Sequence, residues 1–292
     1  DIEDKDYVPI IRDPKATTAD TDAVFYFPGC GSERLFSQVG LATQAMLYQV
    51  GATTVLPPGY LCCGYPQTSS GDEDKGQAIT TANRVLFHRV ANTLNYLDIK
   101  TVVVSCGTCM DQLLKYEFGK IFPGCRLVDI HEWLYEKGIR LDGVKGTQYM
   151  YHEPCHTPMK HHAGIKVANA LMGQRVDLND RCCGESGTLA VTRPDVSTQV
   201  RFRKQQEIEA GTQRLRAMPG VGADAATNCA SSAVKILTSC PSCLQGLSRY
   251  ENDAGITADY IVVEMAKSLL GPDWLQDYVR AANAGGIERV LL

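Results

Sequence analysis

Cys62-Cys63-Gly64 lies at the centre of a cysteine arrangement that begins at Cys30 and ends with Cys106-Gly107-Thr108-Cys109, and the chain contains this arrangement twice. Each copy has a single cysteine, then an adjacent pair followed by glycine, then two cysteines separated by two residues. Corresponding cysteines lie 125, 120 and 134 residues apart. This repetition predicts a tandem duplication with one thiol-rich site in each half. The second copy consists of Cys155, Cys182-Cys183-Gly184 and Cys240-Pro241-Ser242-Cys243.

Short apolar runs of strand length alternate with longer amphipathic stretches through both halves of the chain. This alternation is typical of an α/β fold with parallel strands and helices on the faces of the sheet. We therefore expect two tandem α/β domains, each a mostly parallel sheet flanked by helices. The expected strands are 23–27, 53–56, 101–104, 127–130, 148–151, 175–178, 235–238 and 260–263, and the expected helices are 35–50, 75–97, 109–116, 131–136, 165–172, 197–210 and 264–270.

The duplication also predicts where the domains begin and end. The polar segment 1–22 has no hydrophobic period and reads as a leader or as a linker from an upstream domain. The sequence DGVKG at 142–146 suits a link between domains. The second copy carries a loop-like insertion at 211–232. The expected limits are 23–144 for the first domain, 145–272 for the second and 273–292 for a C-terminal helix or tail.

The cysteines follow the ends of expected strands. Cys30 comes just after the strand 23–27, and Cys106 comes just after the strand that ends at Val104. Cys155 and Cys240 have the same relation to their strands. In open parallel sheets the ligand site lies beyond the carboxyl ends of the strands, so three loops of each half can meet at one point.

Composition excludes several classes of protein. The net charge is −4 and no block of Lys or Arg occurs, so we expect no nucleic-acid partner. No run approaches the about 18 apolar residues of a membrane-spanning helix, which leaves only peripheral membrane association open. No secretory signal is visible. Adjacent cysteines form strained disulfides, so we expect reduced thiols and a cytoplasmic location.

Thiolates are soft ligands that both zinc and iron–sulfur clusters use. Each copy offers five of them, whereas structural zinc takes four ligands. Two adjacent cysteines reach one small ion with difficulty, but they can bind different irons of an extended cluster. This favours iron–sulfur clusters, and zinc at one or both sites stays open as an alternative. The usual ferredoxin string is absent, so ferredoxin-type clusters would belong to another domain or subunit.

Several other residues are left with two interpretations. Cys125 and Cys229 lie outside the repeat, and we expect buried structural thiols, although Cys229 lies in a small-residue stretch where it could be exposed. The pairs His152 with His156 and His161 with His162 either serve the second site or are ordinary loop residues. Glu185 either caps a helix or guides protons.

The ten cysteines resemble the cysteine-rich "CCG" domain family, over about residues 23–270. That family includes the cysteine-rich subunit of heterodisulfide reductase and the iron–sulfur subunits of glycolate, lactate and glycerol-3-phosphate dehydrogenases. The stretches YHEPCHTPMK (151–160) and RCCGESGTLAVTRP (181–194) resemble the C-terminal part of FAD-linked oxidases.

This resemblance implies two tandem domains related by a pseudo-twofold axis, each with a noncubane four-iron cluster on five cysteines. It assigns no catalytic residue. The implied ligands are Cys30, Cys62, Cys63, Cys106 and Cys109 at the first site and Cys155, Cys182, Cys183, Cys240 and Cys243 at the second.

Three functions remain open. The leading one is an iron–sulfur electron-transfer module of a flavin-linked oxidoreductase that acts on 2-hydroxy acids. No G-x-G-x-x-G fingerprint follows a strand, so FAD would be held by a partner flavoprotein domain or subunit, with a ferredoxin-type subunit as a further partner. The alternatives are disulfide reduction at noncubane clusters, as in heterodisulfide reductase, and a zinc-stabilised, non-redox binding module.

Overall fold

The computed structural model of the chain describes residues 4–185, 189–218 and 233–292. The chain divides into two compact units. Unit one comprises Asp1–Ile130 and Leu270–Leu292, and unit two comprises His131–Leu269. Each unit has its own sheet. The predicted α/β class, with mostly parallel sheets flanked by helices, is confirmed.

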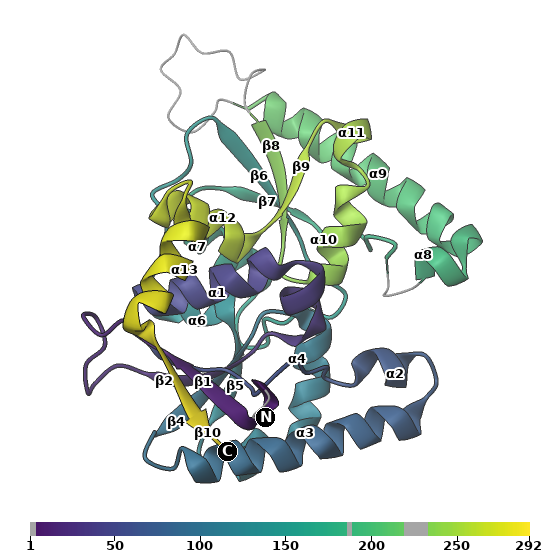
Figure 1. Ribbon diagram of the computed structural model, residues 1–292. Coiled ribbons are helices and arrows are strands. Elements are labelled where there is room, and N and C mark those ends of the chain that lie inside the picture. The colour runs from purple at the N-terminus through teal and green to yellow at the C-terminus, as the bar shows by residue number, and fades with distance from the viewer. Residues whose placement is uncertain (1–3, 186–188, 219–232) are drawn as a thin grey trace. The chain divides into compact units, whose positions relative to one another are not determined.

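Unit one contains a six-stranded sheet in the order β10-β1-β3-β2-β4-β5 (Figure 1). Strands β3, β2, β4 and β5 are parallel, and β1 is antiparallel to both of its neighbours. The strands are β1 (Tyr7–Ile11), β2 (Ala23–Phe27), β3 (Thr53–Val55), β4 (Ile99–Val104), β5 (Arg126–Asp129) and β10 (Ile287–Leu291). The helices are α1 (Ser37–Gln49), α2 (Tyr65–Ser69), α3 (Glu73–Thr93), α4 (Gly107–Leu113), α5 (Phe118–Ile121) and α13 (Trp274–Ala281), with short 3₁₀ or π-helical turns at Asp4–Asp6, Gly31–Leu35, Leu114–Tyr116 and Ala282–Gly286.

Helices cover both faces of this sheet. The long helix α3 lies along one face, and α1 lies with α13 on the other (Figure 1). Helix α3 begins where the side chain of Asp72 accepts a hydrogen bond from the backbone N–H of Lys75. Its buried Phe87 packs on Phe25 of β2, with the ring centroids 5.0 Å apart. The apolar run AVFYF therefore forms a central strand because both of its faces are covered.

Unit two contains a four-stranded sheet in the order β7-β6-β8-β9, and all of its pairings are parallel. Helix α7 lies on one face and the long helix α9 lies on the other (Figure 1). The strands are β6 (Thr147–His152), β7 (Val176–Asn179), β8 (Ala233–Thr238) and β9 (Thr257–Tyr260). The helices are α6 (Ile130–Glu136), α7 (Gly164–Met172), α8 (Leu189–Thr192), α9 (Pro194–Arg216), α10 (Pro241–Ser248), α11 (Glu251–Ala254) and α12 (Ile261–Leu270).

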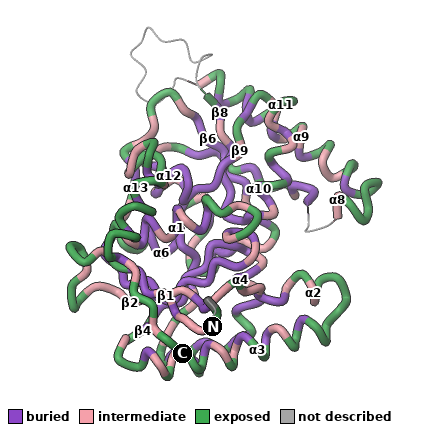
Figure 2. Tube along the Cα trace, in the orientation of Figure 1, coloured by how far each residue is buried: buried purple, intermediate pink, exposed green. Residues whose placement is uncertain are grey.

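The parallel strands of the two units share one order. In each unit the first strand of the repeat lies between the second and the third, and the fourth lies at the edge beyond the third. Strands β3-β2-β4-β5 thus correspond to β7-β6-β8-β9. Most of these strands are buried over most of their length (Figure 2), and the edge strands β5 and β9 are buried at their last two residues. The duplication that the cysteines predicted therefore extends to the topology of both sheets.

Four segments differ from expectation, and the first of them is 287–291, which forms β10 within the expected C-terminal helix or tail because it pairs with β1. Residues 7–11 of the expected leader form β1, although Pro9 weakens that strand signal in the sequence. The expected strand 260–263 ends at Tyr260, and the apolar run that follows begins α12, because a short buried run fits either element. Residues 211–216 of the expected insertion continue α9, and residues 219–232 of it lie outside the described parts of the chain. The predicted domain limits follow the sequence repeat, whereas the two units are defined by how compactly the chain packs. The limits therefore remain a prediction.

No helix in the described parts of the chain is long and apolar enough to cross a membrane.

The aromatic cluster around Phe87 gives a test of the unit one core. Replacing Phe87 with Ala removes a fully buried ring that contacts Phe25, Phe27 and Phe118, so we expect a loss of about 3–5 kcal/mol in unfolding free energy. Urea denaturation measures this loss. Val85→Ala on the same helix is the control, because Val85 is 59% exposed. Equal losses in the two variants would contradict this account of the core.

Candidate metal centres

Both cysteine groups lie at the carboxyl ends of three adjacent parallel strands. In unit one Cys30 follows β2, the Cys62–Cys63 pair follows β3, and Cys106 and Cys109 lie at the start of α4. In unit two the corresponding cysteines follow β6, β7 and β8. Because the strand that carries the single cysteine lies between the other two, the three loops converge. We call these groups site one and site two.

In site one all five thiols are neighbours. They form a continuous series of side-chain contacts in the order Cys30, Cys62, Cys63, Cys109 and Cys106. Three of them are buried, and Cys30 and Cys62 are half-buried. The structure therefore brings together every cysteine that the sequence assigned to the first copy.

In site two four thiols form a similar series, in the order Cys182, Cys183, Cys243 and Cys240. The pKa of Cys182 is raised first by its hydrogen bond with Cys183 and, to a smaller extent, by the charge of Cys155. Cys155 therefore lies near Cys182. Cys155 is exposed, whereas its counterpart Cys30 is half-buried. Site two is thus more open to solvent at this position.

Glycine shapes the loop of the adjacent cysteines in both units. Gly64 has a φ of +92° and Gly184 a φ of +81°, a left-handed conformation that other residues adopt only with strain. Their N–H groups donate to sulfur, from Gly64 to Cys62 Sγ at 3.5 Å and from Gly184 to Cys182 Sγ at 3.4 Å. The Cys-Cys-Gly triplet therefore turns the backbone so that its own amide faces the site.

Two tyrosines hold the adjacent cysteines in place. Tyr116 donates to the carbonyl oxygen of Cys63 at 2.8 Å, and Tyr250 donates to that of Cys183 at 3.1 Å. Burial raises the pKa of each tyrosine to about 12. These tyrosines lie 134 residues apart, which is also the distance between Cys106 and Cys240. Neither tyrosine was predicted from the sequence, although their matching spacing is a signal that the sequence contains.

A second pair of hydrogen bonds is duplicated beneath the Cys-x-x-Cys segments. Tyr26 and Ser105 are hydrogen-bonded at 2.7 Å in unit one, and Tyr151 and Ser239 at 2.9 Å in unit two. Each serine directly precedes the first cysteine of its segment. These bonds join the first strand of each repeat to the loop after the third, so they fix one ligand loop relative to another.

The charge on the thiols is uneven. In site one the thiol of Cys30 hydrogen-bonds to Cys62 and lowers the pKa of Cys62 to about 2. The pKa of Cys109 is raised well above its usual value, first by its hydrogen bond with Cys106 and then by Cys63 and burial. Five crowded thiols cannot all ionise, because their charges repel one another. Thiols must lose their protons to bind a metal, and a bound cation would offset the repulsion between the resulting thiolates.

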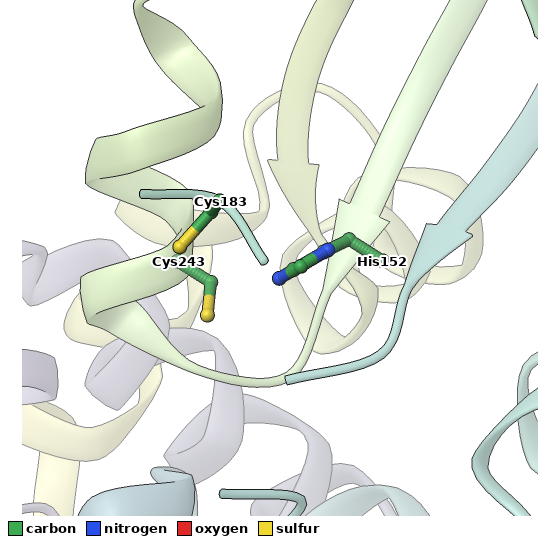
Figure 3. A group of neighbouring side chains, drawn as sticks. All are labelled: His152, Cys183 and Cys243. Atoms are coloured by element: carbon green, nitrogen blue, oxygen red, sulfur yellow. The ribbon is translucent and has the colours of Figure 1, made fainter. Parts of the chain in front are cut away.

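Site two also contains a buried imidazole that has no counterpart among the described residues of site one. His152, the last residue of β6, directs its ring toward Cys183 and Cys243 (Figure 3). One ring nitrogen and the two Sγ atoms lie within 4.8 Å of one another. Among the described residues Nε2 makes no hydrogen bond of ordinary geometry, but the ring lies close enough to lower the pKa of Cys183, after the larger effects of Cys182 and Cys243. A buried ring nitrogen directed at soft thiol ligands fits a site that holds a metal or a cluster.

Behind this imidazole lies Lys204 of α9, whose side chain is fully buried. Its ammonium Nζ lies 3.0 Å from His152 Nδ1, 3.1 Å from the carbonyl oxygen of Asn179 and 3.0 Å from Glu207 Oε2. Burial lowers the pKa of Lys204, and the Glu207 carboxylate opposes that shift. Nothing in the local sequence around Lys204 indicates this buried lysine, because its partners come from β6 and β7.

The remaining candidates have ordinary partners. Glu185 is buried and forms an ion pair with Arg249 at 2.8 Å. The backbone N–H groups of His161 and His162 donate to the carboxylate of Glu132. Cys125 is half-buried, and burial raises its pKa. Cys229 lies outside the described residues.

Comparison with protein families finds one model across both units. A model described as "Cysteine-rich domain" (CCG) matches residues 24–114 and 149–248, more than half of the chain, and these segments contain all ten cysteines of the two sites. A second model, described as "Domain of unknown function (DUF3400)", matches residues 248–292.

Several relatives are similar over most of this chain. An uncharacterized iron-sulfur protein of Methanococcus maripaludis is 22% identical, over 84% of this chain and 46% of that protein. A fumarate reductase (CoM/CoB) subunit of Methanothermobacter marburgensis is 25% identical, over 63% and 37%. A probable glycolate oxidase iron-sulfur subunit of Bacillus subtilis is 23% identical, over 85% and 54%. The chain spans about half the length of these relatives.

Gly29 tests how tightly site one is packed. A Cβ on Gly29 would lie 2.7 Å from Cys109 Sγ, and the φ of +67° is already left-handed. Gly29→Ala should therefore displace Cys109 and expose the thiols of site one to alkylation. Gly71→Ala is the control, because Gly71 has a φ of +92° but no atom within 4 Å of its added Cβ. Equal alkylation rates in the two variants would show that site one is loosely packed.

The tyrosine pair gives a matched test of the two sites. Tyr116→Phe and Tyr250→Phe each remove the donor to a buried carbonyl, so each should lower the unfolding free energy by about 1–3 kcal/mol. Alkylation of the adjacent cysteines should accelerate only in the unit that carries the change. Tyr96→Phe serves as the control, since Tyr96 is 64% exposed. Uniform acceleration in both units would contradict the local action of these bonds.

Proposed function

The chain belongs to the cysteine-rich (CCG) domain family, and from that premise we propose that it binds two iron–sulfur clusters and transfers electrons. The observation that carries this proposal is the gathering of ten thiols into two groups of five at the carboxyl ends of the sheets. Iron–sulfur clusters accept and release single electrons, and the surrounding hydrogen bonds and charges set their potentials. Relatives named as iron-sulfur proteins support this cofactor.

We propose that each site holds a noncubane four-iron cluster. Five ligands exceed the four of a cubane cluster or of structural zinc. The two cysteines of each adjacent pair lie in one tight turn, and this arrangement suits ligands that bind different irons of the same cluster. The proposed ligands are Cys30, Cys62, Cys63, Cys106 and Cys109 at site one and Cys155, Cys182, Cys183, Cys240 and Cys243 at site two.

The proposed reaction partner is a flavoprotein domain or subunit. Oxidation of a 2-hydroxy acid to a 2-oxo acid releases two electrons and two protons. FAD on the partner would take the electrons as a pair, and the two sites would pass them on singly to an acceptor, with a ferredoxin-type subunit as a further carrier. The name of the Bacillus subtilis relative, a glycolate oxidase iron-sulfur subunit, supports this partner. Reduced thiols favour a cytoplasmic location, and peripheral membrane association fits the same scheme.

A second candidate is disulfide reduction at the clusters. The exposure of Cys155 favours it, because a substrate sulfur could approach site two there. Zinc at site two is the remaining alternative, favoured by the close grouping of His152, Cys183 and Cys243. With zinc at both sites the chain would be a binding module without redox activity.

Metal analysis of anaerobically purified protein tests the proposed cofactor. We expect about four irons and four acid-labile sulfides per site. Cys63→Ser and Cys183→Ser should each remove about half of the iron, because each takes a ligand from one site. Cys125→Ser should retain all of it, since Cys125 belongs to neither site. Colourless, zinc-only protein, or equal iron loss in all three variants, would overturn the assignment.

A further inference from the structure

His152 occupies a position in unit two that an apolar ring occupies in unit one. The residue that ends the first strand of each repeat is Phe27 in unit one and His152 in unit two. They lie 125 residues apart, as do the single cysteines Cys30 and Cys155. Phe27 is buried and packs against Phe87, with ring centroids 6.0 Å apart. The two sites therefore have matching cysteines but differ in one side chain, and only the imidazole can bind a metal.

The ring of His152 is close enough to two thiols to share a metal with them. It is fully buried and directed at Cys183 and Cys243 (Figure 3). One ring nitrogen and the two Sγ atoms lie within 4.8 Å of one another. Ligand atoms around one tetrahedral zinc lie about 3.5–4 Å apart, given metal–ligand lengths of about 2.0–2.3 Å. The three atoms are therefore near the separation that a shared metal requires.

Contacts behind the ring hold it in this direction. Nδ1 lies 3.2 Å from the carbonyl oxygen of Asn179, an atom that only accepts hydrogen bonds. Lys204 Nζ lies 3.0 Å from the same Nδ1, and it is also hydrogen-bonded to three oxygens of Asn179 and Glu207. Both neighbours lie at Nδ1, so the nitrogen that faces the sulfurs is Nε2. A backbone carbonyl at one ring nitrogen typically orients a histidine that binds metal through the other.

The single cysteines differ between the two sites as well. Cys30 is half-buried and hydrogen-bonds to Cys62, so it belongs to the contact series of site one. Cys155 is exposed, and it acts on Cys182 as a nearby charge. Unit two thus provides a buried ring nitrogen beside the site in which the single cysteine is less enclosed.

We propose that His152 is a ligand of site two, bound through Nε2 to the same metal as Cys183 and Cys243. This inference rests on the proposed function, in which that metal is one iron of the cluster. Imidazole is a ligand that iron and zinc share, and histidines replace cysteines at one iron of Rieske centres. Site two then has nitrogen and sulfur ligands, whereas the five proposed ligands of site one are all sulfur.

Pulsed electron paramagnetic resonance of iron-loaded protein with ¹⁵N-labelled histidine tests this assignment. With the clusters poised in their paramagnetic state, the wild type should show the coupling of a directly bound nitrogen. His152→Phe copies the residue of site one and should lose that coupling. Absence of the coupling in wild type that contains iron at both sites would overturn the proposal, and this result does not depend on the folding of any variant.

Two further variants separate ligation from loss of structure. His152→Gln has no imidazole and retains a polar side chain, so it should lose the coupling as His152→Phe does. His156→Gln should retain it, although His156 directly follows Cys155 and is therefore the alternative histidine beside site two. Loss of the coupling in His156→Gln, or its retention in either variant of His152, would identify a different ligand and overturn the proposal.

Cobalt binding tests the ring without a cluster. Metal-free Cys63→Ser, in which site one lacks a ligand, is titrated with Co²⁺ and followed by visible absorption. Adding His152→Gln should weaken binding at site two by at least about tenfold, because a ligand is lost, whereas adding His156→Gln should not. Equal affinities with and without His152 would overturn the inference. Wild type that binds no iron, but binds Co²⁺ through His152, would overturn the proposed clusters and still support His152 as a metal ligand.

Discussion

Parallel pairing of three adjacent strands determines where the ten cysteines lie. Strand β2 is hydrogen-bonded to β3 and β4, and β6 is hydrogen-bonded to β7 and β8, so the loops after these strands begin at one edge of each sheet. No cysteine of the two described sites is brought there by a long connection. The convergence depends on buried strands that cannot shift register without exposing apolar side chains. The thiol chemistry of each unit thus depends on the apolar core beneath it.

Hydrogen bonds convert this convergence into a defined site. Both units join the first strand to the third loop through a tyrosine and a serine, and both join a tyrosine to the carbonyl group of the adjacent cysteines. The neighbouring thiols of each site repel one another once they ionise. The buried tyrosines hold the backbone in place while the charge changes. The two units share this framework, and they differ in the side chain that ends the first strand.

Much of the fold could be predicted because the signals were local. The strand at 23–27 appears with its predicted bounds, because AVFYF is rich in aromatic residues and Pro28-Gly29 directly after it excludes a continuing helix. The grouping of the cysteines followed from spacing and strand order. The strand at 7–11 was hidden because Pro9 resembles a break and its partner β10 lies at the far end of the chain. His152 and Lys204 could not be assigned from sequence, since only the fold brings a strand end and a distant helix together. The paired tyrosines and serines could have been found by applying the cysteine offsets to every residue.

The antiparallel pairing of β1 with β10 has a consequence for synthesis. Tyr7 pairs with Leu291, and the whole of unit two lies between these strands in the sequence. On the ribosome β1 is synthesised before unit two and β10 after it, so unit two can fold while one side of β1 is still unpaired. Until β10 is translated, that side of β1 is open to pairing with another nascent chain. Strand β10 then pairs with this side of β1. The charged residues Glu288 and Arg289 of β10 discourage pairing with a further strand.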